Sequence, residues 1–447
     1  MNYFLKTLKL KGYDINNALE QLKVVQGYSV DQFSNWQLTK CWEQFDFFRS
    51  KNEFYKKHVG AQKISQWHEI PVIRKKNFID NQFRLLSDGF TLSNIYQNNT
   101  SGSTGQPLTF FKDKFAHSMT WALIIDRYRW HGISYGEDLQ GRFYGIPLNG
   151  IGYLKEKLKD ILASRVRFPV FNLSASVLDR YTIEISRRPF VYLNGYTSAL
   201  VCYAEYLLKR KLVLKEICPS LLACFPTSEM LNNMERKLIE SAFGIRVVNE
   251  YGCAEMDVLG FEDSNSNFIF SDENVFVEIL DENDMPVQPG FNGRVIVTSL
   301  YNKAMPFIRY DLGDVIALSQ NRQGVNQSIL ELHGRSSDFA YLPDGRHVPS
   351  LTFYYITKAL IKEDFGVEQM IIRQLNYFTF CLEYVSAKEL SIEIRRKIEI
   401  EMERYLMPGL VMLYNRKDYF DRLPSGKQRQ FYNEINLKTD SQKNHFN

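Results

Sequence analysis

The chain has 447 residues, which is too many for one compact core, so two or more domains are expected. Its composition, 45% hydrophobic and 14% aromatic, excludes an intrinsically disordered protein. Its 55 basic and 51 acidic residues leave a formal charge of +4, which is too balanced to indicate nucleic-acid binding.

Targeting signals and cysteine spacing predict the compartment. Residues Met1 to Asp14 mix Lys with Leu and lack the apolar run of a signal peptide, and no run of about 18 apolar residues occurs in the chain. The six cysteines show no C-x-x-C spacing, as expected of reduced thiols rather than a disulfide or zinc framework. We therefore expect a cytoplasmic protein without membrane insertion.

Helical and β-type patterns alternate along most of the chain. Residues 15 to 59 carry Trp, Phe and Leu at helical spacing, and their aromatic side chains are expected in a core. Further helices are predicted for residues 115–130, 176–187 and 198–212, with short β-rich runs between them. This alternation predicts an α/β fold with largely parallel sheets.

The pattern changes in the last third of the sequence. Phe268 to Leu318 predicts a β-rich subdomain, and a new α+β unit of about 110 residues starts after Gly334-Arg335. Its predicted elements are a strand and turn at 341–348, a helix at 351–362, strands at 369–373 and 378–385, and a charged helix at 387–406. We predict a large domain at residues 1–335 and a small mobile domain at 336–447, with a disordered tail after Leu437.

A loop of small and hydroxyl-bearing residues spans Thr100 to Pro107, with the sequence TSGSTGQP. Such a loop turns tightly and can present backbone N–H groups and hydroxyls to a polyphosphate. It lacks the Lys-Ser/Thr pair of a Walker A loop, and Leu108 to Phe111 after it predicts a strand rather than a helix. Taken alone, the loop is equally consistent with a polar hairpin turn.

Four further motifs follow the loop. Asn249 to Glu255 (NEYGCAE) places an aromatic side chain beside glycine and two acids, and Phe307 to Asp314 (FIRYDLGD) ends a strand in an acid. Gly334 to Asp338 (GRSSD) precedes the small domain, and Asp421 to Lys427 (DRLPSGK) puts a lysine on a glycine loop. Together, and in this order, the five motifs resemble the signatures of the adenylate-forming superfamily, which includes acyl-CoA ligases, luciferases and nonribosomal peptide adenylation domains.

A narrower resemblance covers the N-terminal half. Residues 52–55 (NEFY), 70–75 (IPVIRK) and 193–198 (LNGYTS) resemble the phenylacetate-CoA ligase branch of the superfamily. Within that branch the chain is most similar to CapK-type proteins of capsular polysaccharide clusters, where Gly141 to Gly145 (GRFYG) also has a counterpart.

The resemblance implies an enzyme that adenylates a carboxylic acid with ATP and then transfers the acyl group to a nucleophile. Tyr251 would stack on adenine, and Asp314, assisted by Arg335, would accept the ribose hydroxyls. Glu255 would hold Mg²⁺, a hard cation that suits one carboxylate and phosphate oxygens. Lys427 would bridge the α-phosphate and the substrate carboxylate, arriving from the small domain by rotation about Asp338.

The implied nucleotide-binding residues are Thr100, Ser101, Gly102, Ser103, Thr104, Gly105, Glu250, Tyr251, Gly252, Asp314 and Arg335, and the implied catalytic residues are Lys427 and Glu255. The substrate pocket would be lined by residues 142–149, 196–198, 225–229 and 251–256, with Arg142, Tyr196, Ser228 and Glu229 as its candidate residues. Structural interpretations stand beside these roles: Lys427 as a surface lysine, Tyr251 as a core aromatic and Asp314 as a turn acid. Glu250 either faces adenine or caps a strand end.

The chain also departs from its relatives. Gln106 stands where many superfamily members carry Lys, so one phosphate-facing charge is absent or supplied elsewhere. Many members of the branch hold zinc through a Glu-Cys pair, a nearby His and a C-x-C. Here Glu262 is followed by Asp263 and Ser264, and no Cys lies between Asp311 and Gly334, so we predict no structural zinc site.

Three functions remain open from the sequence. The first is an acid ligase that uses ATP, Mg²⁺ and coenzyme A, with a possible place in surface polysaccharide biosynthesis. The second is an amide or ester ligase that acylates an amino or hydroxyl group of a sugar precursor. The third, a non-catalytic nucleotide-binding scaffold, is disfavoured because Glu255, Asp314 and Lys427 are all present. The acid, the acceptor and the choice between monomer and homodimer stay open.

Overall fold

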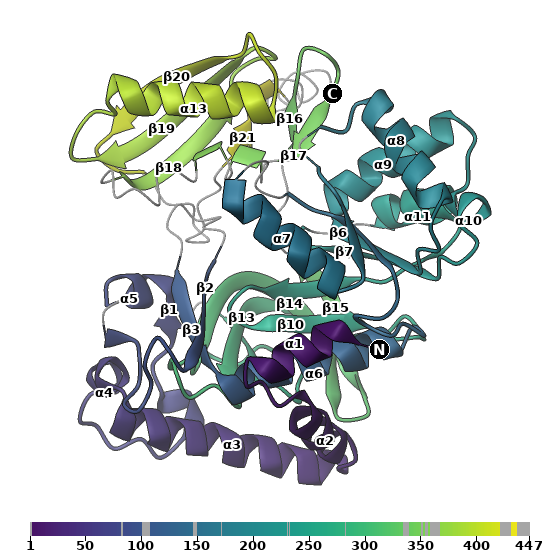
Figure 1. The fold of residues 1–447 in the computed structure, drawn as a ribbon. Helices are drawn as coiled ribbons and strands as arrows, with labels where there is room; N and C mark the ends of the chain where they lie inside the picture. The colour runs from purple at the N-terminus through teal and green to yellow at the C-terminus, as the bar shows by residue number, and fades with distance from the viewer. Residues whose placement is uncertain are drawn as a thin grey trace, which may run out of the picture.

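A computed structural model describes residues 2–81, 84–100, 108–145, 150–170, 172–229, 231, 233–281, 283–333, 339–349, 352–353, 356–357, 367–420 and 431–435 (Figure 1). Its helices are α1 (Tyr3–Leu10), α2 (Ile15–Gln26), α3 (Val30–Lys51), α4 (Glu53–Val59), α5 (Lys75–Ile79), α6 (Lys114–Arg129), α7 (Gly150–Leu162), α8 (Ala175–Ser186), α9 (Thr197–Lys209), α10 (Leu214–Ile217), α11 (Asn233–Phe243) and α13 (Ile392–Tyr405). None of the helices in this part of the chain has the length and hydropathy needed to cross a bilayer.

The helical region predicted for residues 15 to 59 is confirmed as α2, α3 and α4. Polar caps define its boundaries, because the Asp14 carboxylate accepts the Asn17 N–H at the start of α2 and Ser29 forms a capping box with Gln32 at the start of α3. Asn52 ends α3 and caps α4 by accepting the N–H of Tyr55. The aromatic side chains of this region lie in a core, as predicted.

A five-stranded parallel sheet forms the α/β part of the molecule. Its order is β5 (Arg165–Phe168), β4 (Gln140–Phe143), β6 (Tyr192–Tyr196), β7 (Ala223–Thr227) and β8 (Arg246–Val247). Helices α8, α9 and α11 pack with it around one apolar cluster that includes Phe143, Leu193 and Tyr203. The prediction of an α/β fold with parallel strands is confirmed for this sheet.

An eight-stranded sheet forms the β-rich part and is mainly antiparallel. Its order is β12 (Val275–Leu280), β13 (Asn292–Ser299), β14 (Tyr310–Gln323), β15 (Asn326–His333), β11 (Phe268–Phe270), β10 (Asp257–Glu262) and β9 (Glu250–Cys253), with β1 (Ile73–Arg74) parallel to β14. The β-rich subdomain predicted for Phe268 to Leu318 lies in this sheet, where β12, β13, β14 and β15 are joined in sequence by hairpins. The β-rich part is also larger than predicted, since it includes β9, β10 and β15.

Arg309, directly before β14, holds this sheet against the N-terminal segment. Its side chain is 1% exposed, and it donates to the Glu278 carboxylate at 3.1 Å and to the carbonyls of His68 and Ile70 at 2.8 and 2.5 Å. A buried guanidinium requires such partners, because its charge persists at every accessible pH. Arg309 is therefore a structural residue that holds the segment before β1 beside β14.

The C-terminal part contains a four-stranded sheet with its own core. Its order is β20 (Val411–Lys417), β19 (Thr379–Ser386), β18 (Val367–Gln374) and β21 (Phe431–Asn433), and α13 packs on it (Figure 1). Helix α13 begins at Ile392 rather than near Ala387, because Ser391 is its N-cap. Much of the helix predicted at 351–362 and the predicted boundary at residues 335 and 336 lie outside the described residues, so the two-domain division stays a prediction.

Four short strands form two further hairpins. β2 (Ile95–Asn99) pairs with β3 (Thr109–Asp113) in an antiparallel hairpin, and β16 (Phe339–Tyr341) pairs with β17 (His347–Pro349). The predicted strand after the glycine-rich loop is thus confirmed as β3.

The buried carboxyl of Asp272 predicts a pH dependence of stability. Burial raises the pKa of Asp272 to about 7, although the side chain accepts hydrogen bonds from Gln327. The folded state therefore binds a proton that the unfolded chain has released, so the free energy of unfolding falls as the pH rises from about 4 to about 7, by up to about 4 kcal/mol. Asp272→Asn should remove this loss, measured by urea denaturation at several pH values. The control is Asp31→Asn, which alters an exposed acid and should leave the pH dependence unchanged. The prediction would be contradicted if the free energy of unfolding changed with pH in the same way in wild type and in Asp272→Asn.

Candidate active site

Two motifs that are far apart in sequence meet through a crossed pair of hydrogen bonds. The Tyr251 hydroxyl on β9 donates to the Asp314 carboxylate on β14 at 3.0 Å, and the Tyr310 hydroxyl on β14 donates to the Glu255 carboxylate at 3.1 Å. Tyr251, Glu255 and Tyr310 are 7%, 8% and 1% exposed. Each motif thus supplies a tyrosine to the acid of the other, and three residues predicted to bind nucleotide or metal lie in one place.

Gly252 allows the backbone to turn tightly at this point. A Cβ at Gly252 would lie 2.2 Å from the carbonyl oxygen of Asp257, which no other residue could accept without moving the main chain. Asp257 itself has a left-handed φ of 61°, and its carboxylate binds the ammonium of Lys112 and the hydroxyl of Thr120. This ion pair attaches β3, which leaves the glycine-rich loop, to the turn that carries Glu255.

The glycine-rich loop is closed at its base by Thr100. The Thr100 N–H donates to the Leu108 carbonyl, and the Thr100 hydroxyl accepts the Leu108 N–H, both at 2.9 Å. The loop therefore connects two paired strands, which agrees with both interpretations made from the sequence. The phosphate-binding candidates Ser101, Gly102, Ser103, Thr104 and Gly105 lie outside the described residues, as does Gln106.

The substrate-pocket candidates lie at the carboxyl ends of neighbouring parallel strands, the usual place for ligands in open α/β sheets. Arg142 is on β4, Tyr196 ends β6, and Ser228 and Glu229 follow β7. Tyr144 joins them: its ring centroid is 4.1 Å from the Arg142 guanidinium carbon and 4.3 Å from the Tyr196 ring, and its hydroxyl lies 3.3 Å from Ser228 Oγ. Tyr144 lies within the predicted pocket range 142–149 but was not one of its named candidates, although its spacing of two from Arg142 indicates the same side of an extended chain.

Two partly buried glutamates, Glu229 and Glu250, lie beside these candidates. Burial raises the pKa of Glu229, whose carboxylate accepts the Ser198 N–H at 2.7 Å. Burial also raises the pKa of Glu250, which accepts hydrogen bonds from Thr227 at 2.7 Å and Tyr128 at 3.4 Å, against the opposite influence of Arg142. The Glu250 carboxylate is therefore held by neighbouring strands and helices.

Glu262 is held by an arginine. It forms an ion pair with Arg236 at 2.7 Å and accepts the Asn249 N–H at 2.9 Å. In the described part of the chain, no group of three or more His, Cys, Asp and Glu side chains is placed to hold a metal ion. The absence of structural zinc stays a prediction.

Arg335, Asp338 and Lys427 lie outside the described residues, so the structure does not place them.

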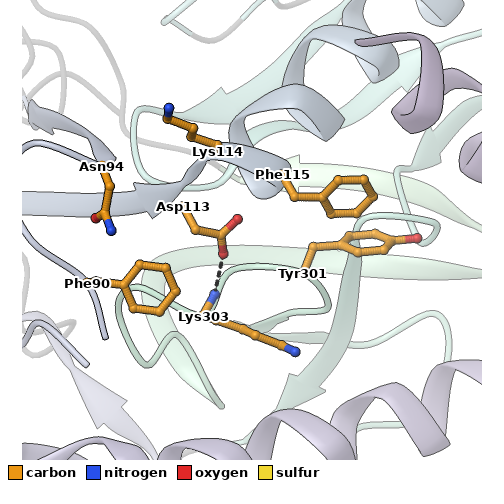
Figure 2. Close-up of a pocket in the computed structure, with 7 residues that line it drawn as sticks. All are labelled: Phe90, Asn94, Asp113, Lys114, Phe115, Tyr301 and Lys303. Carbon is orange, nitrogen blue, oxygen red and sulfur yellow. Dashed lines mark hydrogen bonds between the residues drawn. The ribbon is translucent and has the colours of Figure 1, made fainter. Parts of the chain in front are cut away.

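A separate cavity of about 460 Å³ lies where β3 meets α6, at the end of β3 remote from the loop (Figure 2). It is lined by Phe90, Asn94, Asp113, Lys114, Phe115, Tyr301 and Lys303. Its carboxylate, Asp113, accepts the N–H groups of Ala116 and Lys303 at 2.9 and 2.7 Å and is therefore engaged as the cap of α6. None of the predicted site residues lines this cavity.

Solved structures of 2-hydroxyisobutyryl-CoA ligase match the chain along most of its length. The complex with 2-HIB-AMP and CoA in the thioesterification state has a TM-score of 0.58 at 16% identity, covering 92% of this chain and 93% of that one. The postadenylation complex with R3-HIB-AMP has a TM-score of 0.56 at 17% identity and covers 92% of both chains. The chain has the fold of the adenylate-forming ligases.

In sequence, the chain is 24% identical to Protein CapK of Staphylococcus aureus over 318 residues. The match spans 66% of this chain and 66% of CapK, slightly less than two thirds of its length. No family model matches the chain. The resemblance indicated by the five motifs is confirmed by the adenylate-forming fold, and the crossed pair of Tyr251, Glu255, Tyr310 and Asp314 lies within that fold.

Proposed function

We propose that the chain is an ATP-dependent, AMP-forming ligase that activates a small carboxylic acid. The observation that carries the proposal is the crossed pair, which brings the predicted ribose-binding acid, Asp314, beside the predicted adenine-stacking ring of Tyr251. The adenylate-forming fold and the pocket at the ends of β4, β6 and β7 support it. A scaffold that had lost catalysis would not need both carboxylates, Glu255 and Asp314, with fixed hydrogen-bond donors.

The reaction would proceed in two balanced steps. A carboxylate oxygen attacks the α-phosphorus of ATP, and the bond to the β-phosphate oxygen breaks, which gives acyl-adenylate and pyrophosphate. A nucleophile then attacks the acyl carbon, loses its proton, and releases AMP with the original carboxylate oxygen. The first step brings together two anions, so the protein must hold them in line and spread the charge.

Each residue of the site would contribute a specific contact. Asp314, oriented by the Tyr251 hydroxyl, would accept the ribose hydroxyls, and the Tyr251 ring would pack against adenine. Glu255, oriented by Tyr310, is the carboxylate that would hold Mg²⁺, and its hard oxygen donors suit that ion. Bound Mg²⁺ would screen the charge of the phosphate oxygens. Lys427 would supply the positive charge between the α-phosphate and the acid, from a small domain at 336–447 that closes over the site.

Coenzyme A is the acceptor we favour. The matching 2-hydroxyisobutyryl-CoA ligase was solved with CoA. The similarity to CapK keeps the second candidate, acylation of an amino or hydroxyl group of a sugar precursor. Release of AMP should therefore accelerate when coenzyme A is added to enzyme, acid and ATP. If the rate of AMP release is unchanged by coenzyme A but rises with an amino sugar, the amide or ester ligase is favoured instead.

The direct test of the proposal is acid-dependent exchange of pyrophosphate into ATP, across aryl, hydroxy and amino acids. Asp314→Asn should raise the KM for ATP in this assay by about tenfold to a hundredfold, because hydrogen bonds to a charged group contribute about 1.5–3 kcal/mol. Asp179→Asn, which alters a partly exposed acid on α8, is the control. No exchange with any acid, in a protein that still binds ATP, would move the assignment to a nucleotide-binding scaffold.

The proposed role of Lys427 has its own test. Lys427→Ala should lower the rate of exchange by at least about a hundredfold, because it removes a charge aimed at the reacting phosphate. Binding of Mg²⁺·ATP, measured by calorimetry, should change far less. The control is Lys417→Ala, which removes an exposed lysine on β20 that pairs with Glu383 of the neighbouring strand β19. Unchanged exchange in Lys427→Ala would remove this lysine from the mechanism.

A further inference from the structure

Three arginines lie side by side on β4 and β5, two neighbouring strands at one side of the parallel sheet. Arg142 on β4 pairs directly with Arg167 on β5, and Gln140 pairs with Arg165. Alternate residues of a strand share one face, so the three guanidinium groups lie on the same side of the sheet. The Arg165 side chain confirms this arrangement by donating to the side-chain oxygen of Gln140.

Helix α7 neutralises two of these three charges. Asp160 on α7 lies 2.8 Å from Arg167 and 3.5 Å from Arg165, and Glu156 on α7 lies 3.1 Å from Arg167. The side chains of Arg165 and Arg167 are 8% and 10% exposed. Arginines that are this buried require such carboxylates, because a guanidinium does not lose its charge on burial.

Arg142 receives no such partner. Across the described ranges, no carboxylate lies within 4.0 Å of its guanidinium, and its buried Nε donates no hydrogen bond. Glu250, a pocket acid that interacts with Arg142 through its charge, forms its hydrogen bonds with Thr227 and Tyr128. The guanidinium carbon lies 4.1 Å from the centroid of the Tyr144 ring in a cation–π contact, and a guanidinium has five N–H donors, more than one such neighbour uses.

An arginine placed over an aromatic ring, with no carboxylate beside it, keeps donors that can bind an anion. The edge of a guanidinium presents parallel N–H donors that match the two oxygens of a carboxylate or two oxygens of a phosphate. Because Arg142 lies beside Tyr196 and Ser228 at the carboxyl ends of β4, β6 and β7, the anion would enter the proposed acyl pocket.

We propose that Arg142 binds a second anionic group of the acid substrate, a carboxylate or a phosphate other than the carboxylate that is adenylated. This inference rests on the proposed ligase function. The reacting carboxylate is the less suitable partner, because it loses its charge when the adenylate forms. An arginine bound to it would stabilise the substrate more than the transition state and would slow the reaction. A second anion keeps its charge throughout, so Arg142 can hold it during both steps.

Matched acids test the subsite by direct binding. Calorimetric titrations would compare succinate with butyrate, phthalate with benzoate, and 3-phosphonopropionate with butyrate, without nucleotide. Wild-type protein should bind the best doubly anionic acid about a hundredfold more tightly than its monoanionic partner. Arg142→Met should remove that difference, and Arg142→Lys should restore part of it, because lysine keeps the charge and loses the paired donors. Arg188→Met, at an exposed ion pair on the C-terminal side of α8, should bind like wild type.

Two kinds of failure are distinguishable. Equal binding of doubly and singly anionic acids, or binding unaffected by Arg142→Met, would overturn the subsite. A rise in the KM for ATP alone in Arg142→Met would also overturn it, by assigning this arginine to the nucleotide. Failure of pyrophosphate exchange with every acid, while the binding preference and its loss in Arg142→Met persist, would contradict the ligase and leave the anion subsite intact.

Discussion

The candidate site depends on two hydrogen bonds that cross between β14 and the β9–β10 hairpin. Tyr251 and Glu255 are four residues apart, as are Tyr310 and Asp314, and each tyrosine donates to the acid of the other pair. A carboxylate as buried as Glu255 costs free energy unless a donor compensates it, and Tyr310 is that donor. The same bond fixes where the carboxylate points, so stability and orientation come from one contact.

The surrounding structure supports this arrangement from several directions. The ion pair of Lys112 and Asp257 attaches the strand that leaves the glycine-rich loop to the turn that carries Glu255. Arg309, directly before Tyr310, holds the N-terminal segment beside β14. The parallel sheet would supply the acyl pocket separately, through Tyr144, Tyr196 and Arg142. Nucleotide and acid would therefore bind to two different sheets, which meet where Glu250 on β9 accepts a hydrogen bond from Thr227 on β7.

Much of the fold was predictable from the sequence, while the contacts that define the site were only partly so. The helices at 15–59 and strands such as Val275–Leu280 follow from periodicity and caps. The motifs also identified Tyr251, Glu255 and Asp314. The crossed donors were not predicted, because the pairing of Tyr310 with Glu255 depends on sheet register between distant segments. The β-rich part was underestimated for a similar reason, since pairing of β11 with β15 brings β9 and β10 into the same sheet.

The most direct test of adenylation is to follow one carboxylate oxygen of the acid into the products. A carboxylic acid labelled with ¹⁸O in both carboxylate oxygens would be incubated with the enzyme, ATP, Mg²⁺ and an acceptor, and the products would be analysed by mass spectrometry. Acyl-adenylate chemistry predicts that one ¹⁸O moves to the phosphate of AMP. Unlabelled AMP, or label in inorganic phosphate together with ADP, would contradict adenylation and with it the role assigned to the crossed pair.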